Sequence, residues 1–183
     1  MTDTKQRIAR DLERSFAEHG FAEQGVGALR ADADVSLRTL YKYFPSREAM
    51  IVGALENRDR AYAAWLAGGP DDGIDHILHP LVRLGEWLGE VANTGCLFMN
   101  ALAEYPDSEQ IRTVVRAHKA RMADEFARRL ERVVPDRDTA DLADTLFLLH
   151  EGMTQAARVQ GREKAGEAAM RAARAALAAA NIP

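Results

Sequence analysis

Residues 36–47 carry side chains whose types and spacing suit contact with a nucleic-acid duplex. Arg38 can donate hydrogen bonds to a guanine, and Thr39 can touch a thymine methyl group or a phosphate. Ser46 lies where a helix N-terminus can face a phosphate. The complete set of candidate DNA-contacting residues comprises Ser36, Arg38, Thr39, Tyr41, Lys42, Tyr43, Ser46 and Arg47.

These side chains reach a groove only if a narrow helix presents them. Ser36 can cap a short helix that runs through Tyr43, and Leu40 and Phe44 can dock its opposite face. Leu37 either helps this docking or faces the groove. A short helix at residues 26–31 precedes, so the pair has the spacing of a helix-turn-helix. On periodicity alone, the segment also fits an ordinary amphipathic turn in a helical bundle.

The rest of the chain also follows a helical pattern. Alanine and leucine are common, and apolar residues recur every three or four positions. Pro80 interrupts one of these patterns and should kink the helix. We predict an all-α fold of about nine helices, with a three-helix head and a helical-bundle body. Outside the short pair, helices are expected near residues 3–19, 46–67, 74–91, 97–105, 111–130, 138–159 and 162–180.

Composition limits the possible classes of protein. The chain has 183 residues, of which 47% are hydrophobic and 28% charged, as in a globular protein. The single cysteine, Cys96, excludes an internal disulfide framework and a cysteine-rich zinc site. No apolar run approaches the roughly 20 residues of a membrane span. The net charge of −4 indicates that DNA contact would depend on a few placed cations. We expect a cytoplasmic protein with no membrane contact.

Residues 16–56 read FAEHGFAEQGVGALRADADVSLRTLYKYFPSREAMIVGALE. This stretch resembles the DNA-binding head of TetR-family transcriptional regulators. Two later segments, TGCLFMNALAEYPD at 94–107 and LFLLHEGM at 146–153, are similar to parts of the family's body. The matching positions in the head are Phe16, Gly20, Val35-Ser36, Thr39-Leu40-Tyr41-Lys42-Tyr43-Phe44 and Ser46-Arg47-Glu48.

Four residues of the head depart from the family's usual pattern. Gly25 replaces a capping threonine, and Gly27 replaces a basic or polar residue. Each glycine costs a helix up to about 1 kcal/mol relative to alanine. Arg30 replaces a small packing alanine, and Asp34 replaces the turn glycine. Because aspartate tolerates the left-handed conformation, we expect the turn to form. These departures leave open a regulator-like protein that has lost specific DNA binding.

The resemblance implies a non-enzymatic transcriptional regulator with no cofactor. It implies a DNA-binding domain at residues 1–47 and a ligand-binding and dimerisation domain at residues 48–183. The expected partners are a near-palindromic DNA operator, a second copy of the chain and a small-molecule effector that releases a repressor. The helices at 138–159 and 162–180 are the expected dimer interface, since an alanine-rich helix allows close approach.

Aromatic, sulfur-bearing and polar residues of the body can line an apolar cavity with a few polar groups. Cys96 can be a reactive thiol near a helix start or a small buried hydrophobe. His118 and His150 can bond a ligand or lie satisfied in the core. The candidate ligand-binding residues are Tyr62, Trp65, Trp87, Cys96, Met99, Asn100, Phe126, Phe147, His150 and Met153.

A different class of function stays possible on residue types alone. His76 and His79 lie three residues apart and could hold a metal in a helical-bundle metal protein or enzyme. No third ligand can be named, so we predict no metal site. Glu151 follows His150 directly, and neighbouring residues on a helix point in different directions. We therefore predict that these two side chains do not form an acid/base pair.

Overall fold

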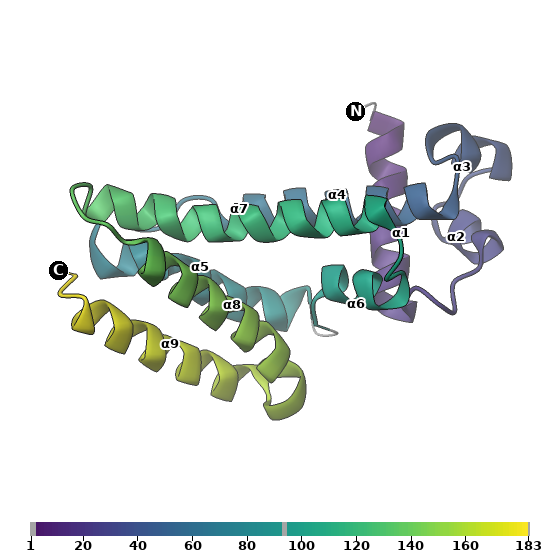
Figure 1. Cartoon of the computed structure of the whole chain (residues 1–183). Helices are drawn as coiled ribbons and strands as arrows, with labels where there is room; N and C mark the ends of the chain where they lie inside the picture. Colours follow the sequence, from purple (N-terminus) through teal and green to yellow (C-terminus); the bar gives the residue numbers. More distant parts are fainter. Residues whose placement is uncertain (1–2, 93–94, 183) are drawn as a thin grey trace. The chain divides into compact units, whose positions relative to one another are not determined.

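The computed structural model describes residues 3–92 and 95–182 (Figure 1). Within these residues all regular elements are helices, nine in number, which confirms the all-α prediction. The expected helices agree with the observed ones to within a few residues at each end. The chain folds into two compact units, residues 1–63 with 96–118 and residues 64–95 with 119–183. None of the described helices is long and apolar enough to span a membrane.

Unit 1 holds the first three helices together with the short α6 and the first part of α4 and of α7. Every fourth residue of α1 faces its core, where Ile8, Leu12 and Phe16 are buried. Leu97 and Phe98 of α6 belong to the same core. The helices are α1 (Asp3–His19), α2 (Val26–Asp32), α3 (Leu37–Tyr43), α4 (Arg47–Leu66), α6 (Leu97–Glu104) and α7 (Glu109–Val133).

Short polar side chains and one glycine set the helix ends in unit 1. Gly20 follows α1 with φ of 78°, a left-handed conformation that ends the helix. The Ser46 Oγ accepts a hydrogen bond from the Ala49 amide at 3.0 Å and caps α4. The Ser108 Oγ accepts one from the Ile111 amide at 3.1 Å and caps α7 in the same way.

Unit 2 is built around α5 (Gly73–Glu90), α8 (Ala140–Gln160) and α9 (Arg162–Ala179), which pack against one another. Figure 1 shows α8 and α9 side by side. Gly161 is the single residue between them. The inner stripe of α9 repeats every four residues and consists of Ala165, Ala169, Ala173 and Leu177. Because three of these four side chains are methyl groups, α9 can approach its neighbours closely. Pro80 lies inside α5, which continues to Glu90.

The compact units and the predicted functional domains are divided at different points. The predicted boundary at residue 47 falls at the first turn of α4, inside unit 1. Unit 1 also contains α6 and the start of α7, because their apolar residues join the core of the first three helices. The extent of the DNA-binding function therefore stays a prediction.

Candidate nucleic-acid interface

The second and third helices form a docked pair joined by a tight turn. Leu40 and Phe44 of the α3 segment are buried, and Leu29 of α2 and Ala33 of the turn are buried with them. Asp34 takes φ of 47°, which confirms that an aspartate can occupy the left-handed turn position. The Asp34 and Val35 amides donate to carbonyls of α2 at 3.0 and 3.3 Å. The arrangement holds α3 by one face and leaves the other in solvent.

The N-terminus of α3 is closed by its own side chains. The Ser36 Oγ accepts a hydrogen bond from the Thr39 amide at 3.1 Å, as the capping prediction requires. The hydroxyls of Ser36 and Thr39 also lie 2.9 Å apart and share a hydrogen bond. Both hydroxyls therefore help to form the first turn, and any contact with DNA would be made while they keep these hydrogen bonds.

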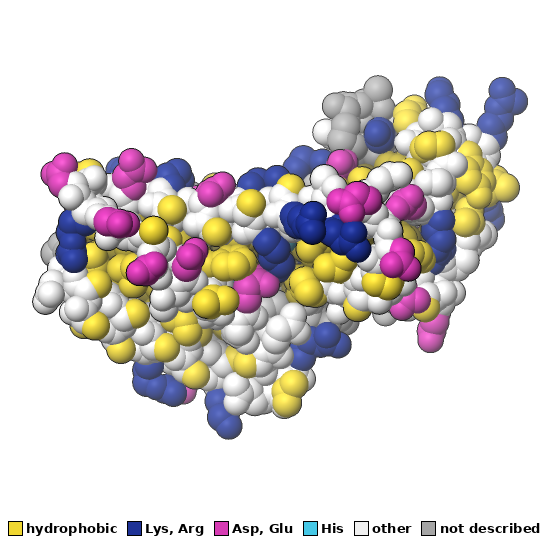
Figure 2. Space-filling model, viewed as in Figure 1, with side chains coloured by type: hydrophobic (Ala, Val, Ile, Leu, Met, Phe, Trp, Pro, Cys, Tyr) yellow, Lys and Arg dark blue, Asp and Glu magenta, His cyan; other side chains and the backbone are white. Residues whose placement is uncertain are grey.

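Four side chains form the solvent face of α3, namely Leu37, Arg38, Tyr41 and Lys42. Leu37 is 47% exposed and Tyr41 is 42% exposed, so neither belongs to the core. Figure 2 shows hydrophobic side chains on the surface over α2 and α3, with Lys and Arg side chains beside them. A face that combines cations, a phenol and an aliphatic chain can meet both phosphates and base edges.

Tyr43 and Ser46 lie at the far end of this surface. Tyr43 is half-buried against the unit 1 core, and the Lys42 ammonium lies 5.4 Å from the centre of its ring. Ser46 is exposed and caps α4 through its side chain. An exposed hydroxyl at a helix N-terminus, where the backbone dipole is positive, suits a phosphate oxygen.

The Arg47 guanidinium is engaged inside the protein. Its two terminal nitrogens donate to the backbone carbonyls of Phe21 and Gln24, and its Nε donates to the Tyr105 hydroxyl at 2.9 Å. These partners take one donor from each nitrogen of a half-buried side chain. The geometry therefore argues against the predicted phosphate contact of Arg47. The sequence contains no signal that these carbonyls, more than twenty residues away, would fold onto it.

α1 supports the helix pair through polar contacts of its own. Arg7 donates to the Ala33 carbonyl at 2.9 Å and to the buried Asp11 carboxylate at 3.2 Å. The Ser15 hydroxyl donates to Asp32, the last residue of α2, at 2.6 Å. These bonds fix both the end of α2 and the turn that follows, so the orientation of α3 rests on α1. Sequence periodicity identified only the apolar face of α1 and did not indicate these contacts.

The unusual residues of the head are accommodated in the structure. Gly25 is the N-cap of α2 and provides no side-chain cap. A Cβ added at Gly25 or Gly27 would meet no atom within 4 Å, so neither glycine is required by packing. Arg30 is exposed, and its Nη1 donates to the Val35 carbonyl at 3.4 Å, beside the turn. The predicted loss of α2 stability from the two glycines stays untested.

The predicted ligand-binding residues are divided between the two units. In unit 1, Tyr62 and Cys96 are buried and Asn100 is half-buried, whereas Met99 is exposed. In unit 2, Trp87, Phe126, His150 and Met153 are buried, and Trp65 and Phe147 are half-buried. The rings of Trp65 and Trp87 meet edge-to-face at 5.6 Å, and Arg83 stacks on Trp65. Met99, which is 39% exposed, is therefore the weakest candidate of the ten.

Unit 1 also holds an aromatic group around His118. The Phe98 ring stacks on the imidazole with centroids 3.7 Å apart, and His118 Nδ1 lies 2.8 Å from the Asp59 carboxylate. This geometry agrees with a histidine that is satisfied in the core. His118 therefore has partners without a ligand.

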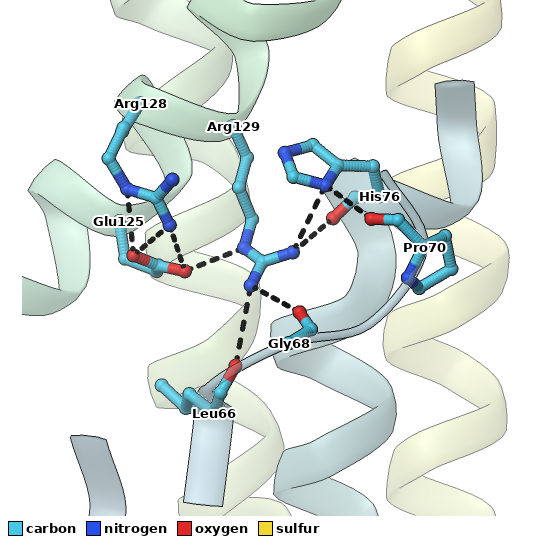
Figure 3. A network of polar contacts seen from close by, with 7 residues as sticks. All are labelled: Leu66, Gly68, Pro70, His76, Glu125, Arg128 and Arg129. Atoms are coloured by element: carbon cyan, nitrogen blue, oxygen red, sulfur yellow. Dashed lines mark hydrogen bonds and ion pairs between the residues drawn. The ribbon is translucent and has the colours of Figure 1, made fainter. Parts of the chain in front are cut away.

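Unit 2 contains a polar network around Arg129, which is only 2% exposed (Figure 3). Arg129 donates to the carbonyls of Leu66, Gly68 and His76 at 3.3, 3.4 and 2.9 Å. Its Nε donates to Glu125 at 2.6 Å, and Arg128 pairs with the same carboxylate. Burial alone would raise the pKa of Glu125, but the hydrogen bonds from the two arginines outweigh it and lower the pKa.

The two carbonyls at the end of α4 explain why this arginine is buried. Leu66 is the last residue of α4 and Gly68 lies two residues beyond it, so their carbonyls have no partner within the helix. Arg129 supplies donors to both. The network therefore fixes the end of α4, and the sequence did not reveal it because Arg129 lies more than fifty residues from the three carbonyls.

The side chains of His150 and Glu151 do not point apart as predicted, whereas the prediction that they form no acid/base pair stays a prediction. His150 Nδ1 lies 3.4 Å from Glu151 Oε1, and Lys119 Nζ lies 2.7 Å from the same carboxylate. Consecutive residues of a helix point about 100° apart, which is unfavourable for a contact between their side chains. The Glu151 side chain is nevertheless long enough to bend back toward His150. Burial lowers the pKa of His150 and favours the neutral ring. The bonds from His150 and Lys119 overcome burial and lower the pKa of Glu151 to about 2.

Neither a metal site nor a ligand cavity emerges from the candidate residues. Among the described residues, no three His, Cys, Asp or Glu side chains are grouped so that they could hold a metal. A cavity of about 290 Å³ lies between the α7–α8 connection and the end of α9. None of the ten predicted ligand-binding residues lines this cavity, whose walls include Arg137, Asp141, Leu142 and Ile182.

The fold and the docked helix pair define a helix-turn-helix protein with an all-helical body. Residues 11–54 match the family model of bacterial regulatory proteins of the tetR family. Residues 84–173 match the model of the tetracyclin repressor-like C-terminal domain. Together the two matches span most of the chain, which belongs to the TetR family of transcriptional regulators. No curated protein matches the chain in sequence.

Solved structures share the whole fold at low sequence identity. SCO4454, a TetR-family transcriptional regulator from Streptomyces coelicolor, superposes with a TM-score of 0.84 at 24% identity, covering 95% of this chain and 94% of that one. A Streptomyces avermitilis protein described as a TetR transcriptional regulator gives 0.80 at 24% identity, with both chains fully covered. The multidrug binding protein EbrR, complexed with imidazole, gives 0.69 at 21% identity, covering 94% and 90%.

Proposed function

We propose that this regulator is a homodimeric repressor that binds a near-palindromic operator through α3 and is released by a small molecule. One observation carries the proposal. Leu40 and Phe44 anchor α3 to the core of unit 1, while Arg38, Tyr41 and Lys42 of the same helix stand in solvent. A helix docked by one face and cationic on the other is what entry into a major groove requires.

The proposed contacts divide the interface into base readout and phosphate binding. Arg38, in the first turn of α3, is placed to donate to a guanine edge. Lys42 supplies charge to the phosphates, and the hydroxyls of Tyr41, Tyr43 and Ser46 add hydrogen bonds. The hydroxyls of Ser36 and Thr39 add further contacts while they cap the helix. Arg47 is left out of this set, because its guanidinium already donates hydrogen bonds to Phe21, Gln24 and Tyr105.

The outer faces of α8 and α9 support the proposed dimer. Leu148 is 66% exposed and Val159 is 90% exposed on α8, and Gly152 lies between them in the same stripe. The outer stripe of α9 consists of exposed alanines, at positions 168, 172, 175 and 179. Large exposed apolar side chains on α8 and a stripe of exposed alanines on α9 favour burial against a second copy.

A small-molecule effector is the third part of the proposal. EbrR, which has the same fold, is described as a multidrug binding protein and was solved with imidazole. Of the predicted ligand residues in unit 2, Phe126 and His150 lie in ring contact with centroids 6.1 Å apart. An effector acts only through its different affinities for the DNA-bound and free states, so it must bind the free state more tightly.

Selection of bound duplexes from a genomic fragment library tests the proposed function. We expect enrichment of a near-palindromic site whose half-sites lie about one helical turn apart, near 34 Å. The affinity for this site should fall steeply as salt rises, because phosphate contacts release counterions. A library that yields no enriched duplex, with the protein folded and dimeric, would contradict DNA binding and favour a regulator-like protein that acts through other partners.

A further inference from the structure

Leu37 is an exposed aliphatic side chain at the end of α3 that the proposed DNA contacts do not use. It is the first residue of the helix and is 47% exposed, whereas Leu40, one turn later, is completely buried. The two alternatives for Leu37 were docking against the core and facing the groove. Its exposure places it on the outer face, beside Arg38 and one turn before Tyr41.

The surroundings of Leu37 say what kind of partner it can meet. The two hydroxyls of its turn belong to Ser36 and Thr39, which already bond each other and the Thr39 amide. The side chains that this turn offers to a partner are therefore the aliphatic Leu37 and the Arg38 guanidinium. Arg38 and Lys42 attract a polyanion to this face, and DNA is the polyanion whose grooves accept a helix.

Base edges differ in what they offer to an aliphatic side chain. In the major groove, guanine, adenine and cytosine present hydrogen-bond donors and acceptors, and thymine alone adds a methyl group. Leucine cannot bond to any donor or acceptor, so pressing it against those edges would leave buried polar groups without partners. Contact with a thymine methyl group avoids this cost and buries apolar surface on both sides.

We propose that Leu37 is a specificity-determining residue that reads the methyl group of a thymine in each operator half-site. The inference rests on the proposed function, since it assumes that α3 enters the major groove. The N-terminal residues of a recognition helix contact base edges, and Leu37 is the first of them. Removing one buried methyl group should weaken binding about fourfold in each half-site, and about fifteenfold when both half-sites are changed.

Deoxyuridine substitution isolates this methyl group. Uracil keeps every hydrogen-bonding group of thymine and lacks only the methyl, so a duplex with one symmetric pair of thymines replaced tests apolar contact alone. The duplex selected for the wild-type dimer would be scanned in this way, one thymine pair at a time. Each duplex would be titrated with the wild type, with Leu37→Ala and with the control Val82→Ala. Val82 lies on α5 and is 46% exposed, which matches Leu37.

The expected result is one thymine pair whose replacement weakens wild-type and Val82→Ala binding by an order of magnitude and leaves Leu37→Ala binding unchanged. Circular dichroism and size-exclusion chromatography would verify that Leu37→Ala stays folded and in the same assembly. Wild-type binding that ignores every replacement overturns the inference, as does a methyl dependence that persists in Leu37→Ala. These outcomes leave DNA binding intact, whereas failure of the proposed function appears earlier, as the absence of any selected duplex.

Discussion

Arg47 and Tyr105 join two segments of unit 1 that lie 58 residues apart in the chain. Arg47 begins α4, and Tyr105 follows α6. The Nε of Arg47 donates to the Tyr105 hydroxyl at 2.9 Å, and the rest of the guanidinium donates to the carbonyls of Phe21 and Gln24. One arginine therefore ties the α1–α2 connection, the start of α4 and the end of α6 together. Its role is to position the helix pair.

Replacing Arg47 with methionine tests this role. The substitution keeps much of the aliphatic stem and leaves two backbone carbonyls and a phenol without their donor. We expect the free energy of unfolding to fall by about 2–3 kcal/mol, because the lost hydrogen bonds are charge-assisted and part-buried. Urea denaturation followed by circular dichroism measures the change. The salt dependence of operator affinity should keep its slope, since no phosphate contact is removed.

Tyr105→Phe is the matched control for Arg47→Met. It removes a single hydroxyl and leaves the two carbonyl contacts, so we expect a loss of about 1 kcal/mol. The Arg47 interpretation fails if Arg47→Met leaves stability unchanged and lowers the slope of log affinity against log salt by about 0.9 for each lost contact. That pattern would return Arg47 to the phosphate-binding set.

Arg38 and Lys42 should affect operator binding in different ways. Arg38→Ala removes the proposed guanine contact, so we expect a loss of about 1–3 kcal/mol on the selected duplex and little change on unrelated DNA. Lys42→Ala removes a phosphate contact, so affinity should fall on all duplexes and the salt slope should decrease. Fluorescence anisotropy titrations at several salt concentrations separate the two. Equal losses on selected and unrelated DNA for Arg38→Ala would contradict its role in base readout.

The local features of the helix pair were predictable because they depend on neighbouring residues. Ser36 caps α3, and Leu40 with Phe44 docks it, because capping and helical periodicity act over three or four positions. The partners of Arg47 were not predictable, since tertiary packing brings the Phe21 and Gln24 carbonyls to it.

The error at His150 has a different cause. A helical projection gives the direction in which each side chain leaves the backbone, and it assigns His150 and Glu151 different directions. It does not describe how far a long, flexible side chain can bend toward a neighbouring residue. Glu151 bends toward His150 and Lys119 because both donors lie within its reach. The interaction depends on Lys119 from another helix, which no local pattern contains.

Leu148→Glu should disrupt the proposed dimer. Leu148 is exposed on the outer face of α8, and a second copy would bury it, so a glutamate there would place two charges in an apolar interface. We expect the variant to sediment as a folded monomer at concentrations where the wild type is a dimer. Val82→Glu, on the exposed surface of α5, should keep the wild-type assembly. Unchanged sedimentation of Leu148→Glu would place the interface elsewhere.

Arg129→Met should cost more stability than any surface substitution. The variant would leave the Leu66, Gly68 and His76 carbonyls without their donor, and we expect a loss of about 3–5 kcal/mol. Arg132→Met is the control, because Arg132 is exposed and its ion pair with Asp71 is long, at 3.7 Å. That change should stay within about 0.5 kcal/mol. Similar thermal unfolding of the two variants would show that the Arg129 network adds nothing to stability.

Buried His150, with half-buried Glu151 and Lys119 beside it, should make the protein sensitive to mild acid. Burial lowers the pKa of His150 in the folded protein below 6.5, its ordinary value. As the pH falls below 6.5, the unfolded chain takes up a proton that the folded protein refuses, so stability is lost. The slope for this one group approaches 1.4 kcal/mol per pH unit. Glu151 affects stability at lower pH. Its contribution is present above pH 4.5 and disappears as the pH falls toward its folded pKa of about 2.

His150→Gln separates the histidine from the other acid-sensitive groups. Glutamine cannot take up a proton, so the free energy of unfolding should vary less between pH 7.5 and pH 5.5 than in the wild type. His79, whose pKa is also lowered by burial, remains in both proteins and cancels in the comparison. Urea denaturation at each pH gives both curves. Equal slopes above pH 5.5 would mean that His150 takes up its proton as readily in the folded protein as in the unfolded chain.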